Sequence, residues 1–289
     1  MASDKQSSAK TFRLIDFHVH LRKPQPWTYP RQLGLSAEQL IARMDREGID
    51  KSVLLPIESP EGHEFFLNED AVAARDAYPE RFIAFVAVDP RRTQVQERIA
   101  AHIEKCDCRG FGEHKNSLAF DDPLCEAVYE VCNHYRLPLV FHMDPTLCVD
   151  DIGLPRLERM AEKYRNVKFV GHGPGFWAAI SGDDGRSGGY PKGPIEPGGA
   201  LDRLLGQYDN IYAEFSAGSG HNALTRDPQF TEGFVERNHD KLIFGTDYLQ
   251  AGQSLPQIEW LAALDMPIEW RQQMAYANAQ RIMGMSEEP

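Results

Sequence analysis

Eight short apolar segments, each followed by a segment with helical spacing of its apolar residues, span nearly the whole chain. The apolar segments are mostly unbroken runs, as expected for parallel strands that are buried on both faces. Eight such units in strict alternation predict an α/β fold, the (β/α)8 TIM barrel, with a doubly wound open sheet as the rival. The predicted strands are residues 12–21, 51–57, 81–88, 109–115, 137–142, 167–172, 210–216 and 241–247.

The segments between the strands predict the helices and one insertion. A Gly- and Pro-rich stretch, residues 173–198, predicts a long loop insertion after the sixth strand. No linker divides the chain, so residues 11–289 are expected to form a single barrel domain after a disordered N-terminus at residues 1–10. The predicted helices are residues 36–48, 68–78, 93–105, 123–135, 154–164, 200–207, 229–238, 256–264 and 268–283.

The charge balance and the cysteines limit the classes of partner and the compartment. The chain has 289 residues and a formal net charge of −12, which disfavours nucleic acid and anionic membranes because both bind basic surfaces. It contains no run of 18 apolar residues that would predict a transmembrane helix, and its polar first ten residues do not resemble a secretory signal. Five cysteines without a C-x-x-C pair predict reduced thiols in a cytoplasmic protein.

Metal-ligand side chains end five of the eight predicted strands. His18 and His20 share one face of the first strand, because alternate side chains of a strand point the same way. In a barrel the chemistry lies at the carboxyl ends of the strands. Imidazole and carboxylate groups together suit a divalent ion such as Zn²⁺, Mn²⁺ or Fe²⁺. The later strand ends supply Glu113, His142, His172 and Asp247.

Each of these residues also has a plain structural interpretation when it is taken alone. His142 could be a hydrogen-bonded core histidine, His172 a turn residue, and Asp247 the cap of the following segment. Their joint position at strand ends favours the metal site.

Five motifs carry a resemblance to a known family. In chain order they are DFHVH, GFGEHK, VFHMD, VGHG and IFGTD. The pattern resembles the amidohydrolase superfamily, in particular the amidohydrolase 2 branch that is related to the aminocarboxymuconate semialdehyde decarboxylases. Residues 278–284 are similar to the last helix of that superfamily, so the resemblance covers residues 12–285.

The resemblance implies roles for the strand-end residues. His18 and His20 would bind the more buried metal, and Asp247 would complete its ligand shell and accept a proton from the attacking water. His142 would be a ligand from the fifth strand. His172 would be a ligand of a second metal or, in a one-metal site, a general base or electrostatic stabiliser.

The fourth strand decides between one metal and two. Two-metal members of the superfamily commonly carry a carboxylated lysine or a glutamate here, and Glu113 is the favoured ligand. Alternatively, Glu113 pairs with Lys115, which would contact substrate or be carboxylated itself. His114 points to the other face and is expected to pack toward the helices. Asp16 would either orient an imidazole through its N–H or pair with a strand lysine such as Lys168.

Loop residues near the strand ends are candidates for substrate recognition. Arg22 begins a loop with cations and aromatic residues, and Arg226 is a further cation that could bind a substrate carboxylate. Trp177 lies in the Gly/Pro-rich insertion, which would form a lid or pocket wall. For the charged residues, the alternative is a solvated surface side chain. The predicted substrate-binding residues are Arg22, Lys115, Trp177 and His221.

These features predict a metal-dependent hydrolase that uses a metal-activated water on an amide, ester or lactone bond of a small polar substrate. The alternatives are a metal-dependent non-oxidative decarboxylase or hydratase, a lyase of the same fold, and a barrel without catalytic activity. One or two ions are expected, with Zn²⁺ first and Mn²⁺ or Fe²⁺ as alternatives. The expected partner is a small-molecule substrate, and a homodimer is a common assembly for barrels.

Overall fold

The computed structural model describes residues 13–22, 34–62, 66–185 and 190–285. The predicted disordered segment, residues 1–10, lies outside the described residues. Most of the predicted loop after Arg22, residues 23–33, lies outside them as well.

All eight predicted strands form, and every ladder between them is parallel and joins strands that are consecutive in the chain. The observed strands are shorter than the apolar runs that predict them, since those runs continue into the turns at either end. Relative to its length, the eighth strand is shortened most, from a predicted seven residues to two. The strands are β1 Ile15–Val19, β2 Lys51–Leu54, β3 Phe82–Ala84, β4 Phe111–His114, β5 Pro138–His142, β6 Lys168–His172, β7 Ile211–Glu214 and β8 Leu242–Ile243.

The strands form two sheets, β1-β2-β3 and β4-β5-β6-β7-β8, which two isolated bridges join into a closed barrel. One bridge pairs Val86 with Phe111, after β3 and at the start of β4. The other pairs Val19, at the end of β1, with Tyr248, beyond β8. Since the first and last strands are joined, the rival open sheet is excluded and the predicted (β/α)8 barrel is confirmed.

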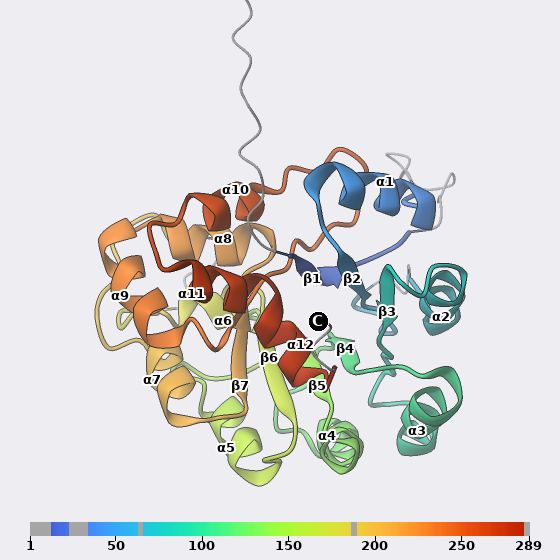
Figure 1. The fold of residues 1–289 in the computed structure, drawn as a ribbon. Coiled ribbons are helices and arrows are strands. Elements are labelled where there is room, and N and C mark those ends of the chain that lie inside the picture. Colours follow the sequence, from blue (N-terminus) through green and yellow to red (C-terminus); the bar gives the residue numbers. More distant parts are fainter. Residues whose placement is uncertain (1–12, 23–33, 63–65, 186–189, 286–289) are drawn as a thin grey trace, which may run out of the picture.

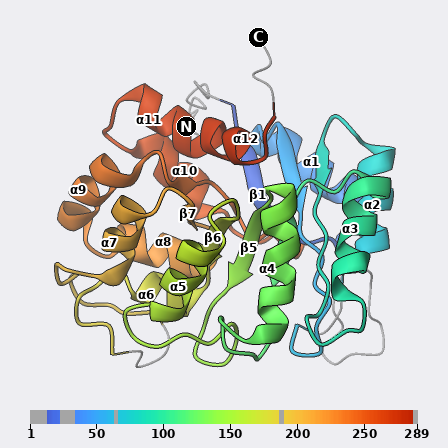
Figure 2. The same ribbon diagram turned by 90° about the horizontal axis from the view of Figure 1, so that it is seen from below.

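Helices surround the strands on all sides (Figure 1), and the view turned by 90° shows them lying along the outside of the barrel (Figure 2). Among the described residues, no helix has the length and apolar character needed to cross a bilayer. A π-helical turn, Gln273–Ala277, interrupts the predicted last helix. The helices are α1 Ala37–Glu47, α2 Asn68–Ala77, α3 Val95–Cys106, α4 Pro123–Tyr135, α5 Pro155–Lys163, α6 Pro174–Ala178, α7 Ala200–Gln207, α8 Ala217–Thr225, α9 Pro228–Asn238, α10 Pro256–Ala263, α11 Ile268–Gln272 and α12 Asn278–Ile282.

Local sequence signals set several helix ends. At the start of α1, the Ser36 hydroxyl accepts from the backbone N–H of Gln39, and the Gln39 side chain accepts from the N–H of Ser36. The same helix ends at Gly48, whose φ of 66° is left-handed. The α4 helix begins with Pro123 after an Asp122 cap.

Two helices, α6 and α8, are absent from the sequence prediction. The α6 helix lies inside the predicted insertion, so residues 173–198 are not a loop throughout. The α8 helix carries Gly218 and Gly220, which favour a turn on composition alone. A Cβ at Gly220 would lie 2.6 Å from the carbonyl carbon of Phe215, so glycine lets α8 pack closely on the end of β7.

The hydrophobic core lies between the sheet and the outer helices, and aromatic rings fill much of it near α4. The Phe120 ring centroid lies 4.7 Å from that of Phe141 on β5. The Tyr129 ring meets Phe169 on β6 edge to face at 5.4 Å. His114 points outward into this cluster and contacts Tyr129, as predicted from the strand alternation. This packing fixes the strands whose carboxyl ends carry the site.

Candidate metal centre

Ligand atoms from the two ends of the chain meet at the carboxyl ends of β1 and β8. The Nε2 atoms of His18 and His20 lie 3.0 Å apart. One carboxylate oxygen of Asp247 lies 3.7 Å from the first of these nitrogens and 3.4 Å from the second. Both histidines are buried, whereas the Asp247 side chain is 19% exposed and so faces the open end of the barrel.

Hydrogen bonds from the outer ring nitrogens aim both histidines at this point. Nδ1 of His20 lies 2.7 Å from the carbonyl oxygen of Leu55, to which it donates. Nδ1 of His18 lies 3.0 Å from a carboxylate oxygen of Glu214. A histidine that donates from Nδ1 presents the lone pair of Nε2, the arrangement that metal-binding histidines show.

The backbone at Asp247 is held in an uncommon conformation. Its φ of 53° is left-handed, which aspartate tolerates better than most residues. Its N–H donates to the carbonyl of His18 at 2.9 Å, so this residue of the segment after β8 is tied to the strand of the first histidine. Burial disfavours the charged carboxyl, but the nearby His18, His20 and His172 outweigh this effect and hold the pKa of Asp247 below its usual value.

Glu113 lies between two groups of histidines. One carboxylate oxygen is 3.5 Å from Nε2 of His20, and the other is 3.2 Å from Nδ1 of His142. It is 3% exposed, and among the described residues neither oxygen accepts a hydrogen bond of good geometry. In the described part of the chain, ligand atoms within 4.8 Å of one another form three groups: His18, His20 and Glu113; Glu113, His142 and His172; and His18, His172 and Asp247.

The charge and burial of these imidazole and carboxylate groups suit a bound divalent cation. Despite burial, the pKa of Glu113 is held well below its usual value by Lys115 and the surrounding histidines. Burial lowers the pKa of His18, but the carboxylates of Asp247, Glu214 and Glu113 outweigh it and raise that pKa to about 9. Buried carboxylates that lack hydrogen-bond donors are costly unless a cation compensates them.

Lys115 directly follows β4, the strand that carries Glu113. Its ammonium lies 3.6 Å from a Glu113 oxygen, so the predicted pairing of the two side chains is present alongside the histidine contacts. The Lys115 side chain is 23% exposed. It is therefore placed to meet a bound molecule, and its role in substrate contact stays a prediction.

The remaining two histidines are each held by a carboxylate. Nε2 of His142 lies 3.1 Å from Asp144, which also accepts from the backbone N–H groups of Thr146 and Leu147. Nδ1 of His172 lies 3.3 Å from Glu214, and its Nε2 lies 3.9 Å from Asp247.

Asp144 and Glu214 are site residues that the sequence analysis missed. Asp144 stands within the motif VFHMD, two residues after His142, and Glu214 is an acidic residue inside an otherwise apolar strand. The orienting role predicted for Asp16 is wrong. Its carboxylate accepts from the hydroxyl and N–H of Thr246 at 2.6 and 2.9 Å, and its pKa rises to about 7 by burial.

The other predicted substrate-binding residues differ in their exposure to solvent. Trp177 is 2% exposed, and its indole N–H donates to the backbone carbonyl of Glu214 at 3.0 Å. It lines a small cavity together with Tyr190 and Arg226. His221 is partly exposed on α8, and Arg22 is partly exposed at the end of the first described segment. Their roles in substrate binding stay predictions.

Comparison with known proteins assigns the family. The family model described as amidohydrolase matches residues 15–285, nearly the whole chain. This chain belongs to the amidohydrolase family. Comparison with curated protein sequences gives no match.

Several solved structures share the fold. An uncharacterised TIM-barrel protein from Bordetella bronchiseptica has a TM-score of 0.67 at 16% identity, covering 94% of this chain and 99% of its own. The 5-carboxyvanillate decarboxylase from Sphingomonas paucimobilis has a TM-score of 0.62 at 18% identity, covering 96% and 100%. A dihydroxybenzoic acid decarboxylase from Polaromonas sp. JS666, solved with bound manganese, has a TM-score of 0.61 at 15% identity, covering 96% and 98%.

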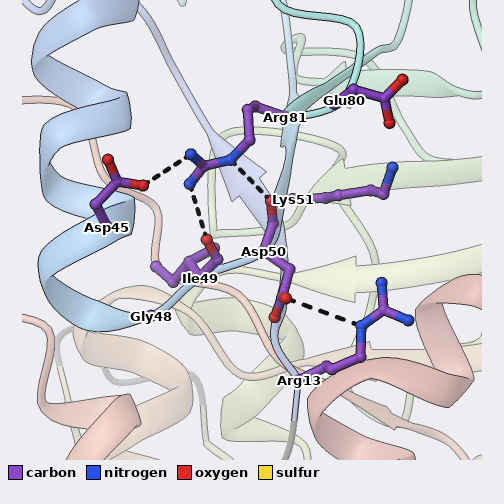
Figure 3. Close-up of a pocket in the computed structure, with 8 residues that line it drawn as sticks. All are labelled: Arg13, Asp45, Gly48, Ile49, Asp50, Lys51, Glu80 and Arg81. Carbon is purple, nitrogen blue, oxygen red and sulfur yellow. Dashed lines mark hydrogen bonds and ion pairs between the residues drawn. The ribbon is translucent and has the colours of Figure 1, made fainter.

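A second cavity of this amidohydrolase, of about 460 Å³ (Figure 3), is lined by residues at the starts of β1, β2 and β3, and thus lies at the amino-terminal end of the barrel. Both of its arginines pair with aspartates: Arg81 lies 2.7 Å from Asp45, and Arg13 lies 3.8 Å from Asp50. In barrel enzymes the amino-terminal face contributes to stability rather than to chemistry. The cavity is lined by Arg13, Asp45, Gly48, Ile49, Asp50, Lys51, Glu80 and Arg81.

Proposed function

We propose that this amidohydrolase is a metal-dependent hydrolase that cleaves an amide, ester or lactone bond of a small polar substrate. One observation carries the proposal: the buried carboxylate of Glu113 contacts His20 on one side and His142 on the other. A carboxylate in this position could be shared by two divalent cations, which would supply an activated water for hydrolysis.

The ligand residues can be assigned to two ions. His18, His20 and Asp247 would hold the first, and His142 and His172 the second, with Glu113 shared between them. Divalent ions in such a site polarise a substrate carbonyl and lower the pKa of water to about 7. Zn²⁺ is the proposed metal because it suits a histidine-rich donor set. Mn²⁺ is the alternative, since structural neighbours carry it.

The chain supplies the proton transfer and the binding of charged substrate groups. Asp247 is ionised at neutral pH and partly open to the mouth, so it can take the proton of the attacking water and deliver it to the leaving group. The Lys115 ammonium, at the same opening, would bind an anionic or carbonyl oxygen of the substrate.

A decarboxylase or hydratase is the second candidate, and the decarboxylases among the structural neighbours favour it. In that reaction one ion would suffice. His172 would then move the proton, because its Nδ1 is held by Glu214 and its Nε2 faces Asp247.

We also propose a cytoplasmic location and a small-molecule substrate, with neither nucleic acid nor membrane as partner. All five cysteines are free, and four of them are buried, as is usual for proteins of a reducing compartment. A homodimer is proposed as the assembly, and sedimentation of the purified protein would test it.

Metal content separates the two candidate reactions. The wild type and Glu113→Ala would be loaded with Zn²⁺ and analysed for metal per chain. Exposed Glu130→Ala, on α4, is the matched control. Two equivalents that fall to one or fewer in Glu113→Ala, but not in the control, support the bridged two-metal hydrolase. One equivalent in all three proteins contradicts it and favours the lyase.

Product analysis then tests the reaction class directly. A panel of lactones, esters and amides would be assayed for acid release, and a panel of aromatic carboxylic acids for release of CO2. Turnover of the first panel that requires Asp247 supports hydrolysis. Release of CO2 alone would overturn the hydrolase proposal.

A further inference from the structure

Glu214, at the end of β7, contacts two histidines of the site at once. Its Oε2 atom lies 3.0 Å from Nδ1 of His18 and 3.3 Å from Nδ1 of His172. The same oxygen accepts a hydrogen bond from the hydroxyl of Ser216 at 2.9 Å. The side chain is fully buried, and it belongs to none of the ligand groups at the centre of the site.

The surrounding chain is shaped around this carboxylate. A Cβ at Gly245 would lie 2.1 Å from Oε1 of Glu214, so only glycine leaves room there. The indole of Trp177 donates to the backbone carbonyl of Glu214. Nδ1 of His18 and Nδ1 of His172 therefore face the same buried carboxylate oxygen.

We propose that Glu214 is a positioning residue that fixes the tautomer and orientation of His18 and His172 together. Nδ1–H of His18 donates to the carboxylate, and Nδ1 of His172 lies 3.3 Å from the same oxygen and 2.9 Å from the Ser216 hydroxyl that donates to it, so both Nε2 atoms point toward the centre. Because one oxygen serves both rings, losing it loosens the metal ligand His18 and the proton-transfer candidate His172 in the same step. This joint positioning of His18 and His172 would apply to a hydrolase and to a lyase alike.

The neighbouring hydroxyl allows the two contacts to be separated. The hydroxyl of Ser216 lies 2.9 Å from Nδ1 of His172. Within the described part of the chain, it makes no hydrogen bond to His18. Removing its hydroxyl should therefore disturb His172 alone. A role for Glu214 in packing only would instead leave both rings unchanged in the isosteric Glu214→Gln.

Histidine tautomers can be observed directly in the wild type. With ¹⁵N-labelled histidine and Zn²⁺ bound, NMR should show His18 and His172 protonated at Nδ1 and slowly exchanging. Loss of the signals in His18→Gln and His172→Gln assigns them. An Nε2–H tautomer for either ring in the wild type would overturn the proposal without any further variant.

Cobalt titration measures the effect on the metal. Glu214→Gln should weaken binding of the first Co²⁺ by about 10- to 100-fold and alter its visible spectrum, since partners of ligating histidines have effects of this size. Ser216→Ala should leave the first Co²⁺ within about threefold of wild type. Gly245→Ala, which keeps Glu214 but displaces its carboxylate, should reproduce the weaker binding. Wild-type affinity and spectrum in both Glu214→Gln and Gly245→Ala would refute the positioning role.

Discussion

At the scale of single residues, the site is ordered by the outer nitrogens of its imidazoles. His20 donates to the carbonyl of Leu55, an acceptor that no side-chain substitution removes. His142 is held by the side chain of Asp144, and His18 by that of Glu214. These bonds limit ring rotation before any ligand arrives, which lowers the entropy that binding must remove.

Lys115 provides a residue-scale test of substrate charge. Its partly exposed ammonium at the mouth should hold an anionic or carbonyl oxygen, so Lys115→Met should raise KM by about 10- to 100-fold, the size of a charge-assisted hydrogen bond. Metal content should stay at the wild-type level. Steady-state kinetics and metal analysis would be compared with Lys105→Met, an exposed lysine on α3. An unchanged KM would remove Lys115 from the substrate site.

At the scale of elements, close packing of α8 on β7 depends on one glycine. Ala at position 220 would place a Cβ 2.6 Å from backbone carbon of Phe215, which cannot rotate away. Gly220→Ala should therefore destabilise the fold by about 1–3 kcal/mol in urea unfolding. Gly206→Ala on α7, where a Cβ meets nothing within 4 Å, should be neutral or slightly stabilising. Equal effects of the two changes would contradict this packing.

Glu61 joins three successive loops at the carboxyl end of the barrel. It accepts two bonds from Arg91, at 2.8 Å each, and one from Ser117 at 2.7 Å. The bond from Arg91 is the main cause that lowers the pKa of Glu61 to about 2 from its usual 4.5. A lowered folded-state pKa means that this stabilisation is present above about pH 4.5 and is lost as the pH falls toward 2.

Glu61→Gln should accordingly cost about 1 kcal/mol at pH 7, since the ion pair is partly exposed. Stability curves of the variant and the wild type should converge as the pH falls toward 2. If the difference in the free energy of unfolding between the two proteins stayed constant across this pH range, the charge of Glu61 would not contribute to stability. Glu130→Gln, on the exposed face of α4, serves as the control.

The sequence predicts elements well where the signal is local. Every strand is an apolar run, and the ligand-type residues from His18 to Asp247 can be found because each follows such a run. Contacts between residues that lie far apart in the sequence leave no such pattern. Asp16 meets Thr246, 230 residues away, and Glu214 meets His18 across 196 residues. The α8 helix was missed for a different reason, because Gly218 and Gly220 favour a turn on composition, whereas the close approach of Gly220 to the Phe215 backbone exists only in the folded chain.

At the scale of the whole molecule, the candidate centre lies where the barrel closes. Its residues come from β1, β4, β5 and β6 and from the segment after β8, and thus from both sheets. The closing bridge from Val19 to Tyr248 and the bond from Asp247 N–H to His18 lie directly beside it. A cation bound here would tie together strands that are otherwise joined by isolated bridges.

Metal should therefore stabilise the entire fold and not the site alone. A ligand bound only by the folded state adds about 4 kcal/mol at a free concentration of about 1,000 times its Kd, which raises Tm by several degrees in a chain of this size. Calorimetry with Zn²⁺ and with a chelator should show this difference in the wild type. His18→Gln should lose much of this rise in Tm, because the first ion loses a central ligand while the ligands of the second remain. A rise in Tm as large in His18→Gln as in the wild type would place the stabilising ion elsewhere.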